Sequence, residues 1–317
     1  MQRDIDQKFV ISVTKNVCYR ARARALKALS GSLTNHYKML SSHVAELKKV
    51  YKHGLFSIMV EGHNRFKRMF VGFDALKEGF LGGCFLKSEV GGQLLSVVGR
   101  DGNNQIFPVC WDVVEGENED SWRSFLIRLT EHLGIVDGFG LTIISDQQKG
   151  LQNAVRAFMP NAEHRNCARH LYANWKKKHV GYALKNLFWK AAKSTTEAQF
   201  NEHMYEMKVL SQVAHDDFIK IGSNKFCRFK ISTLPKCEII DNNMFECFNG
   251  YILRAKNRLL IDMLEDIRRT IMKTMAEKRE TIMKSDDTIC PKIRKNVEEN
   301  KIVRWRLVHY FLDYQAI

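Results

Sequence analysis

The sequence predicts a mixed α/β core followed by a helical region. Between residues 55 and 114, short apolar runs alternate with turn residues, which is typical of hairpin strands. From residue 120 to 158, two segments of helical periodicity flank one continuous apolar run, which indicates a buried strand between two helices. Beyond residue 171 nearly every segment has apolar residues at helical spacing, so the sheet is expected to carry a helical insertion and C-terminal helices.

The N-terminal region predicts two helices, over 15–29 and 37–51, because apolar residues recur there at helical spacing. Their Arg and Lys side chains suit contacts with phosphates, although a solvated helical face explains them as well. Four strands are expected next, over 55–60, 68–73, 92–100 and 105–114. The last two are joined by Asp101-Gly102-Asn103-Asn104, whose residue types favour the left-handed turn of a hairpin.

A helix is expected over 120–133, where one stripe of side chains is apolar and either Asp120 or Ser121 serves as the N-cap. The apolar run 141–145 then predicts a central strand covered on both faces. The remaining segments with helical periodicity are 148–158, 172–179, 182–193, 197–210, 215–220 and 242–283. They indicate that the second half of the chain is almost wholly helical.

The charge balance makes nucleic acid the leading candidate partner. Fifty Lys and Arg stand against 35 Asp and Glu, a formal net charge of +15, and such a surface attracts polyanions. A basic protein without a nucleic-acid role remains the alternative. No apolar run is long enough for a membrane span, no secretory signal is recognised, and the eight cysteines show no repeated close pairing. We therefore expect reduced thiols, a cytosolic or nuclear location and no membrane association.

Asp146 is the first candidate for chemistry, because it ends the apolar run where open α/β sheets place ligands and catalytic groups. A carboxylate there can hold a divalent cation, and a helix-capping acid explains it equally well. Cys167 and His170 form a Cys-x-x-His pair that could share a metal ion. Because no second such pair follows, a buried thiol beside a hydrogen-bonded histidine is the competing interpretation.

A third group of polar residues begins at Asp241-Asn242-Asn243. If the segment is helical, Glu246 lies on one face with Asn242, Asn243 and Asn249, a carboxylate flanked by amides. Such a face could coordinate a metal ion and position a phosphate. A helix cap followed by a solvated polar face explains the same residues.

Together these segments resemble the transposases of Mutator-like elements in plants, over about residues 17–295. The matching strings are Phe85-Leu86-Lys87, Gly91-Gly92-Gln93-Leu94-Leu95, Val98-Gly99-Arg100-Asp101, Ile144-Ser145-Asp146-Gln147-Gln148-Lys149-Gly150, Asn161-Ala162-Glu163-His164-Arg165, Cys167-Ala168-Arg169-His170 and Asp241-Asn242-Asn243-Met244. Their length and order identify the chain as similar to that family.

The resemblance implies a ribonuclease-H-like mixed sheet with a helical insertion, and three acids that bind two Mg²⁺ or Mn²⁺ ions. Asp146 matches the second Asp of that triad, Glu246 matches the closing Glu, and Cys167 with His170 matches the family's Cys-x-x-His, structural or zinc-binding. Two-metal chemistry needs shared acids, since one ion activates the attacking oxygen and the other stabilises the leaving oxygen. DNA is the implied partner, the nucleus is the expected compartment, and a homo-oligomer is possible.

The chain departs from the family pattern at the first acid. The family carries an apolar strand ending in Asp-Gly-Cys before Phe-Leu-Lys, whereas this chain reads Gly79-Phe80-Leu81-Gly82-Gly83-Cys84-Phe85-Leu86-Lys87, as though that strand had been removed. Gly82 then stands where the first Asp is expected. The nearby acids Asp74, Glu78 and Glu89 are not expected to replace it, because none ends an apolar strand.

Three regions are expected. Residues 1–54 form a helical region that retains part of a DNA-binding region, and residues 55–295 form the transposase domain with its helical insertion at about 171–240. Residues 296–317 form a divergent tail without a zinc knuckle. The predicted function is DNA binding by a transposase-derived protein that is defective in strand cleavage and transfer. The alternatives are an active or partly active two-metal transposase or nuclease, a domesticated transcription regulator, and a decaying copy that folds poorly because a lost central strand would expose sheet edges.

Overall fold

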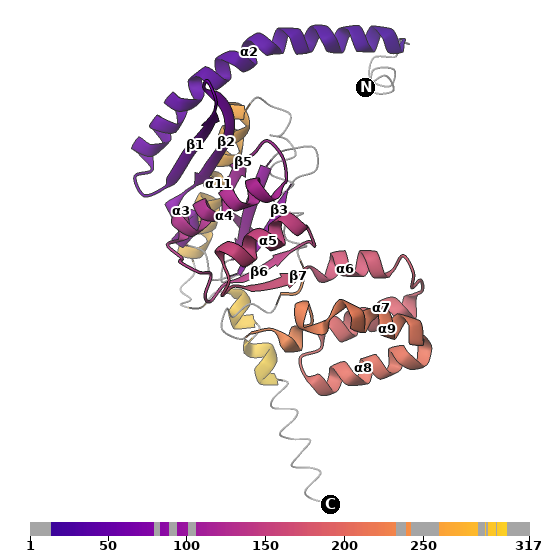
Figure 1. Ribbon diagram of the computed structural model, residues 1–317. Helices are drawn as coiled ribbons and strands as arrows, with labels where there is room; N and C mark the ends of the chain where they lie inside the picture. Colours follow the sequence, from indigo (N-terminus) through magenta and orange to yellow (C-terminus); the bar gives the residue numbers. More distant parts are fainter. Residues whose placement is uncertain are drawn as a thin grey trace, which may run out of the picture.

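A computed structural model gives the arrangement of most of the chain (Figure 1). The residues that it describes are 14–78, 83–88, 94–100, 106–232, 239–241, 260–284, 289, 291–295 and 297–302. Three ranges that matter to the sequence interpretation lie outside these residues. They are 79–82 with Gly82, the turn 101–105, and 242–259 with Glu246.

The core is a mixed sheet in which the described residues form seven strands in the order β1-β2-β5-β4-β3-β6-β7 (Figure 1). The strands are β1 (Leu55–Glu61), β2 (Arg65–Gly72), β3 (Gly83–Ser88), β4 (Leu94–Arg100), β5 (Ile106–Val113), β6 (Thr142–Ser145) and β7 (Glu163–Asn166). Neighbours from β1 to β3 pair antiparallel, whereas β3 pairs parallel with β6, and β6 with β7. The predicted mixed α/β core is therefore confirmed.

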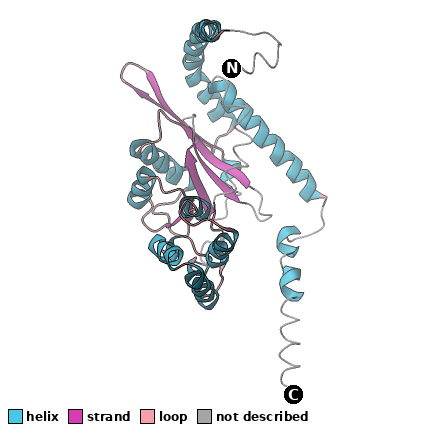
Figure 2. Cartoon of the chain, turned by 90° about the vertical axis from the view of Figure 1, so that its right-hand side faces the viewer, coloured by secondary structure: helices cyan, strands magenta, loops and turns pink. Residues whose placement is uncertain are grey.

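Helices cover both faces of the sheet, as the edge-on view shows (Figure 2). The helices described are α2 (Lys15–Val50), α3 (Asp74–Glu78), α4 (Glu119–Leu133), α5 (Lys149–Phe158), α6 (Ala168–Trp175), α7 (Tyr182–Lys193), α8 (Glu197–Leu210), α9 (Gln212–Ile221) and α11 (Leu260–Met283). Buried apolar residues of α2 and α11 pack on one face, and those of α4 and α5 on the other. Helices α6 to α9 share a third apolar cluster and lie beside β7 (Figure 1).

The pattern-based boundaries fit best where one face of an element is buried. Helices α7 and α8 begin and end at the expected residues, and the four hairpin strands are found within two or three residues of their expected ends. Three expectations are wrong. The helix expected over 172–179 is found four residues earlier, as α6 at Ala168–Trp175. The N-terminal region is one 36-residue helix rather than two, because no proline interrupts it and a single internal glycine does not stop a helix. The cap of α4 is Asn118, not Asp120 or Ser121.

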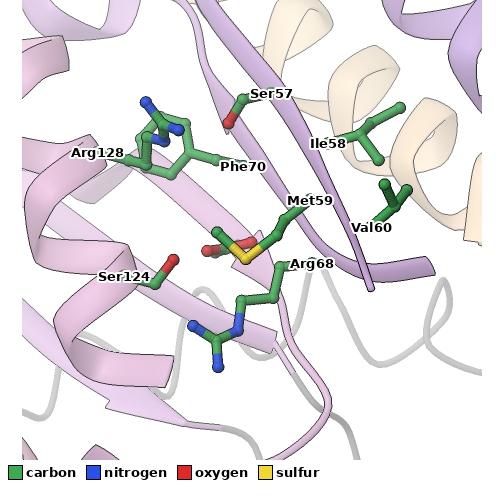
Figure 3. Close-up of a pocket in the computed structure, with 9 residues that line it drawn as sticks. Ser57, Ile58, Met59, Val60, Arg68, Phe70, Ser124 and Arg128 are labelled. Carbon is green, nitrogen blue, oxygen red and sulfur yellow. The ribbon is translucent and has the colours of Figure 1, made fainter. Parts of the chain in front are cut away.

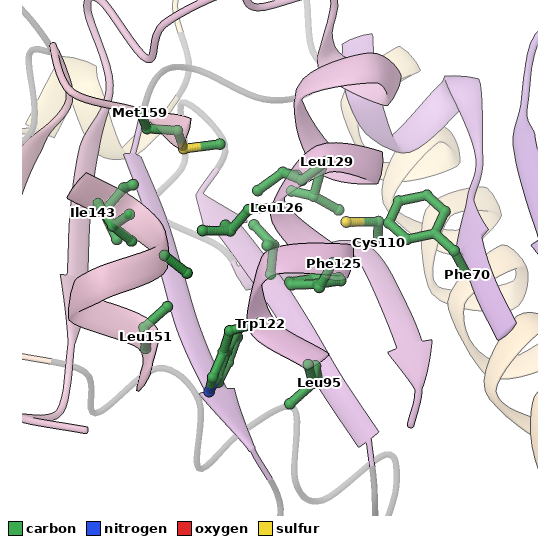
Figure 4. Packing of buried hydrophobic residues seen from close by; sticks show 14 of the residues in the cluster. Phe70, Leu95, Cys110, Trp122, Phe125, Leu126, Leu129, Ile143, Leu151 and Met159 are labelled. Atoms are coloured by element: carbon green, nitrogen blue, oxygen red, sulfur yellow. The ribbon is translucent and has the colours of Figure 1, made fainter. Parts of the chain in front are cut away.

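Helix α4 is fixed at both ends by its own sequence. Asn118 and Ser121 form a reciprocal capping box, in which each side chain accepts from the other's backbone N–H at 2.9 and 3.0 Å. Gly134 ends the helix with φ 69°, a left-handed conformation that glycine adopts without strain. Between the caps, Trp122, Phe125 and their apolar neighbours pack onto the sheet (Figure 4). Burying each such side chain contributes about 1.5 to 3 kcal/mol.

Helices α4 and α5 meet at a contact that only glycine permits. A Cβ atom on Gly150 would lie 2.9 Å from the backbone nitrogen of Glu119 and 3.1 Å from its Cα atom. Both neighbours are main-chain atoms, so neither can turn away as a flexible side chain would. The side chain of Asn153 strengthens the contact, because its Nδ2 donates to the Glu119 carboxylate at 2.9 Å.

A buried arginine holds the loop between β5 and α4. Arg68, 3% exposed, donates from Nε to the carboxylate of Glu115 at 2.8 Å and from Nη2 to that of Asp120 at 2.6 Å. Its Nη1 also donates to the carbonyl oxygen of Asp120 at 2.9 Å. The hydrogen bonds to Glu115 and Asp120 raise the pKa of the guanidinium above its ordinary value, and the hydrogen bond from Arg68 lowers the pKa of Glu115.

We expect Arg68→Ala to lower the free energy of unfolding by about 1 to 3 kcal/mol, because it removes several charge-assisted hydrogen bonds. Arg128→Ala is the matched control, since Arg128 pairs with Glu131 on the surface. That change should cost less than about 1 kcal/mol. Urea unfolding of both variants measures the difference, and equal midpoints would contradict the structural role of Arg68.

Asp112 on β5 is a buried acid beside a small hollow. The hollow has a volume of about 280 Å³ and is lined by β1, β2, β5 and α4, with Arg68, Ser124 and Arg128 among its residues (Figure 3). Asp112 is 1% exposed, and among the described residues its Oδ1 atom has no hydrogen-bond partner. Burial raises the pKa of Asp112 to about 7, against the opposing charge of Arg68.

This pKa predicts a stability that depends on pH. Because the folded pKa is raised from 3.8 to about 7, the folded state keeps a proton that the unfolded chain has released. The contribution of Asp112 to the free energy of unfolding is therefore fully present below about pH 4. It falls by on the order of 1 kcal/mol per pH unit as the pH rises from there to the folded pKa of about 7. Asp112→Asn should remove that loss, so its advantage over the unaltered protein in urea unfolding should be larger at pH 8 than at pH 5. An equal difference at both pH values would be the contrary result.

Candidate functional site

Asp146 directly follows β6, at the sheet edge where the parallel strands β3, β6 and β7 all end. Ser145, the last residue of β6, is level with Leu86 on β3 and Asn166 on β7. Asp146, one residue further, is therefore level with Lys87 after Leu86 and with Cys167 after Asn166. The carboxyl edge of parallel strands is where α/β sheets place reactive groups.

The strand beside β6 carries no acid. Strand β3 reads Gly-Cys-Phe-Leu-Lys-Ser over Gly83–Ser88, and it pairs with β6 from Gly83 opposite Thr142 to Leu86 opposite Ser145. The sequence suggested that a central strand had been removed, and the structure corrects this expectation. The segment with Phe-Leu-Lys is itself a central strand, paired between β4 and β6. Among the described residues of this strand there is no carboxylate to share a metal ion with Asp146.

The direction of the strands separates Asp74 from Asp146. Strand β2 runs opposite to β5, β5 opposite to β4, and β4 opposite to β3, so β2 runs opposite to β3 and β6. Asp74 begins α3 just after β2 and lies at the edge where β6 begins, away from Asp146. Glu78, the last residue of α3, follows within one short helix of that edge. Glu89 lies outside the described residues.

The sequence interpretation missed a group of acids at the correct edge. Strand β5 runs in the same direction as β6, so the loop after it brings Glu115, Glu117, Glu119 and Asp120 to the edge of Asp146. Strand direction is the signal that would have found them. Glu115 and Asp120 pair with Arg68, and Glu119 accepts from Asn153. Within the part of the chain that the structure describes, no three His, Cys, Asp or Glu side chains are placed to hold a metal ion.

Ser145 and His164 stabilise the backbone at Asp146. The Ser145 hydroxyl donates to the Asp146 carbonyl oxygen at 2.9 Å and lies 2.7 Å from Nε2 of His164. Because that hydroxyl has a single proton, the imidazole Nε2–H is then the donor to the Ser145 oxygen. Burial and the charge of Arg156 lower the pKa of His164 to about 4, so the ring is neutral near pH 7. The pair can position Asp146 but supplies no charge to a metal ion.

Cys167 and His170 follow the next strand, β7: Cys167 is the N-cap of α6, and His170 lies in the first turn of that helix. Cys167 is 1% exposed, its backbone N–H donates to the Ser145 carbonyl oxygen at 2.8 Å, and it packs against Ile144 and Ile239. His170 follows one turn later and is half-buried, with no hydrogen-bond partner at Nδ1 among the described residues. Cys167 and His170 therefore lie at the same edge of the sheet as Asp146.

The segment 239–241, from much later in the chain, also lies at this edge of the sheet. The backbone N–H of Ala168 donates to the Ile240 carbonyl oxygen at 2.9 Å, which brings Asp241 beside the first residues of α6. Asp146, Cys167 and Asp241 thus come from three distant parts of the sequence to one edge. Glu246 follows Asp241 by five positions but lies outside the described residues.

We expect Cys167→Ala to lower the free energy of unfolding by about 1 to 3 kcal/mol, with or without added zinc, because the thiol fills a buried contact. Cys227→Ala is a control, since Cys227 is also buried, in the cluster of α6 to α9. Thermal unfolding and the zinc content of both variants decide the matter. Stoichiometric zinc lost only from Cys167→Ala would assign a metal role instead.

Comparison with known families agrees with the resemblance drawn from the motifs. The family model of the MULE transposase domain matches residues 80–174, which include β3 to β7 and most of α6. No curated protein matches the chain. Within the described residues, no helix is both long and apolar enough to cross a membrane. The matched segment contains Asp146, Cys167 and His170, and over these residues the chain is similar to the transposase domain of Mutator-like elements.

Proposed function

We propose that this protein is a DNA-binding derivative of a Mutator-like transposase that no longer cleaves or joins DNA strands. The observation that carries the proposal is the sequence of β3. This strand is the parallel neighbour of β6, the strand that directly precedes Asp146, and none of its six residues is an acid. The defect lies at the position where a shared carboxylate would be required.

The strand order supports the ribonuclease-H-like part of the proposal. Strands β5, β4 and β3 form an antiparallel meander, and β6 and β7 extend it with parallel strands on the side of β3. Helices α4 and α5 cover one face. The mixed sheet and the helical insertion after β7 both agree with the architecture that the family resemblance implies.

The partners of several acids near Asp146 weigh against a two-ion site. Two ions are held about 4 Å apart only when carboxylates are shared between them. Mg²⁺ keeps its waters unless several charged oxygens are already in place. Of the acids that share an edge with Asp146, Glu115 and Asp120 are engaged by Arg68 and Glu119 by Asn153. Asp146 with Glu246 would give at most a weak site for Mg²⁺ or Mn²⁺.

Charge supports DNA as the partner and the nucleus as the compartment of this function. The excess of 50 basic over 35 acidic residues does not depend on an intact metal site. Phosphate neutralisation supplies most of the affinity of sequence-independent binding. Loss of catalysis therefore leaves DNA association in place.

We expect no cleavage or joining of DNA by the unaltered protein in Mg²⁺ or Mn²⁺, and no further change in Asp146→Ala. Each 1.4 kcal/mol of lost transition-state stabilisation is about tenfold in rate, and a missing shared acid removes several kcal/mol. A labelled duplex carrying the ends of a Mutator-like element, incubated with both proteins at saturation, provides the assay. Metal-dependent cleavage that disappears in Asp146→Ala would reveal a replacement acid and refute the proposed defect.

We also expect DNA affinity to depend steeply on salt. If six or more phosphates are engaged, the association constant should fall by orders of magnitude, about a thousandfold, between about 50 and 200 mM salt. Fluorescence anisotropy with a labelled duplex at a series of salt concentrations measures the slope. An affinity that does not change with salt would mean that the positive charge has another purpose.

A further inference from the structure

Helices α6 and α7 form the most one-sidedly basic part of the helical region. Residues 168–196 contain seven Lys and Arg and no Asp or Glu, whereas acids reappear from Glu197 onward. Because the two helices belong to one packed cluster, this charge is presented by a fixed surface rather than by a tail. A run of charge alone is usually a solvated face, so its geometry decides what it can bind.

A hollow with aromatic walls lies within this basic surface. It has a volume of about 440 Å³ and is lined by Arg169, Tyr172, Ala173, Lys176, Lys185, Trp189, Lys193 and Asp241. A second hollow, of about 490 Å³, begins on the other side and shares Trp189 and Lys193 with the first. The indole of Trp189 therefore lies between two openings, half-buried and reachable from both.

The aromatic and cationic groups of the hollow are arranged for stacking. The rings of Tyr172 and Trp189 have centroids 5.6 Å apart at an angle of 50°, which fixes each against the other. The ammonium of Lys193 lies 5.5 Å from the centre of the Trp189 ring, and that of Lys176 lies 5.8 Å from the centre of Tyr172. These cations occupy ring faces that a planar base could take, because a lysine side chain can swing to a nearby phosphate.

The cations of the hollow are available to a ligand. Among the residues that the structure describes, none of Arg169, Lys176, Lys185 and Lys193 forms an ion pair. Neighbouring lysines differ, since Lys178 and Lys220 face Asp217, and Lys230 faces Glu197. Unpaired cations beside half-buried rings that open onto a hollow are an arrangement with which proteins hold single-stranded nucleic acid.

We propose that this hollow holds an unpaired nucleotide of a DNA strand, with its base against Trp189 and its phosphates on Lys185 and Lys193. The proposal rests on the proposed DNA-binding function and adds which form of DNA is held and where. A volume of a few hundred Å³ suits a nucleotide-sized group, and the width of a duplex does not fit inside it. Helix α6 begins beside Asp146 and reaches Lys176 about 12 Å further along its axis. The hollow is therefore one or two nucleotide steps away from Asp146.

The first experiment compares two double variants of equal charge. Lys185→Gln with Lys193→Gln alters the hollow, and Lys208→Gln with Lys225→Gln alters exposed lysines that line neither hollow. All four side chains are exposed, so both proteins should melt at the temperature of the unaltered chain. With a labelled oligothymidylate, the hollow variant should lose about 0.7 from the salt slope for each phosphate contact removed. The control variant should keep the slope, and equal slopes in the two variants would overturn the proposal.

The second experiment separates stacking from charge. An abasic oligonucleotide of the same length has the same phosphates but no bases, so the unaltered protein should bind it at least about fivefold more weakly than oligothymidylate. Trp189→Leu should remove that difference, and Trp189→Phe should retain most of it because the ring remains. A preference for bases that is unchanged in Trp189→Leu would exclude the hollow as the stacking site.

The outcomes distinguish this proposal from the proposed function. If the unaltered protein binds neither duplex nor single-stranded DNA, the DNA-binding function itself fails. If it binds both, and the hollow variant behaves as the control does, DNA binding stands and the hollow is not the site. Thymidine monophosphate is the competitor: displacement of oligothymidylate at micromolar concentration would assign the hollow to a free nucleotide, whereas no displacement supports a strand.

Discussion

The parallel pairing of β3 with β6 is the joint on which the rest of the fold depends. On one side of it, β1, β2, β5 and β4 are connected as antiparallel neighbours, and on the other side β6 pairs only with β7. Without β3, the described strands β4 and β6 would both present unpaired edges, which invite pairing with other chains. Ladder bonds are made by main-chain atoms, so a strand can keep this joint whatever side chains it carries. The fold therefore does not depend on whether a side chain of this strand takes part in chemistry.

Much of the architecture could be predicted because burial of one face leaves a period in the sequence. Helices α7 and α8 and the strands of the two hairpins have such a period, and their expected positions agree with the structure. Strand β3 could not be recognised, because its six residues were interpreted as the remainder of a motif after a deletion. Whether that segment fills the gap depends on pairing with residues nearly sixty positions later, which no local pattern records.

The candidate site was predicted in part for a similar reason. Asp146 and Cys167 follow strands, and a strand end is visible in the sequence as an apolar run that stops at a polar residue. The acids Glu115 to Asp120 were missed because their relevance depends on the direction of β5 relative to β6. Arg68 shows why their presence does not by itself make a metal site. Its guanidinium pairs with both Glu115 and Asp120 and so fixes the loop that carries them. These two carboxylates therefore have a structural role that does not involve a metal ion.

The glycine at position 150 has a consequence for how the history of this protein can be traced. Its missing side chain lets α5 approach the backbone at Glu119, and this contact has no part in holding a metal ion. A lineage that drifts without any selection should accumulate larger residues there as readily as it loses catalytic acids. A lineage retained for a folded, non-catalytic purpose should lose the acids and keep the glycine. In sequences that descend from the same ancestor, this one position therefore separates decay from domestication.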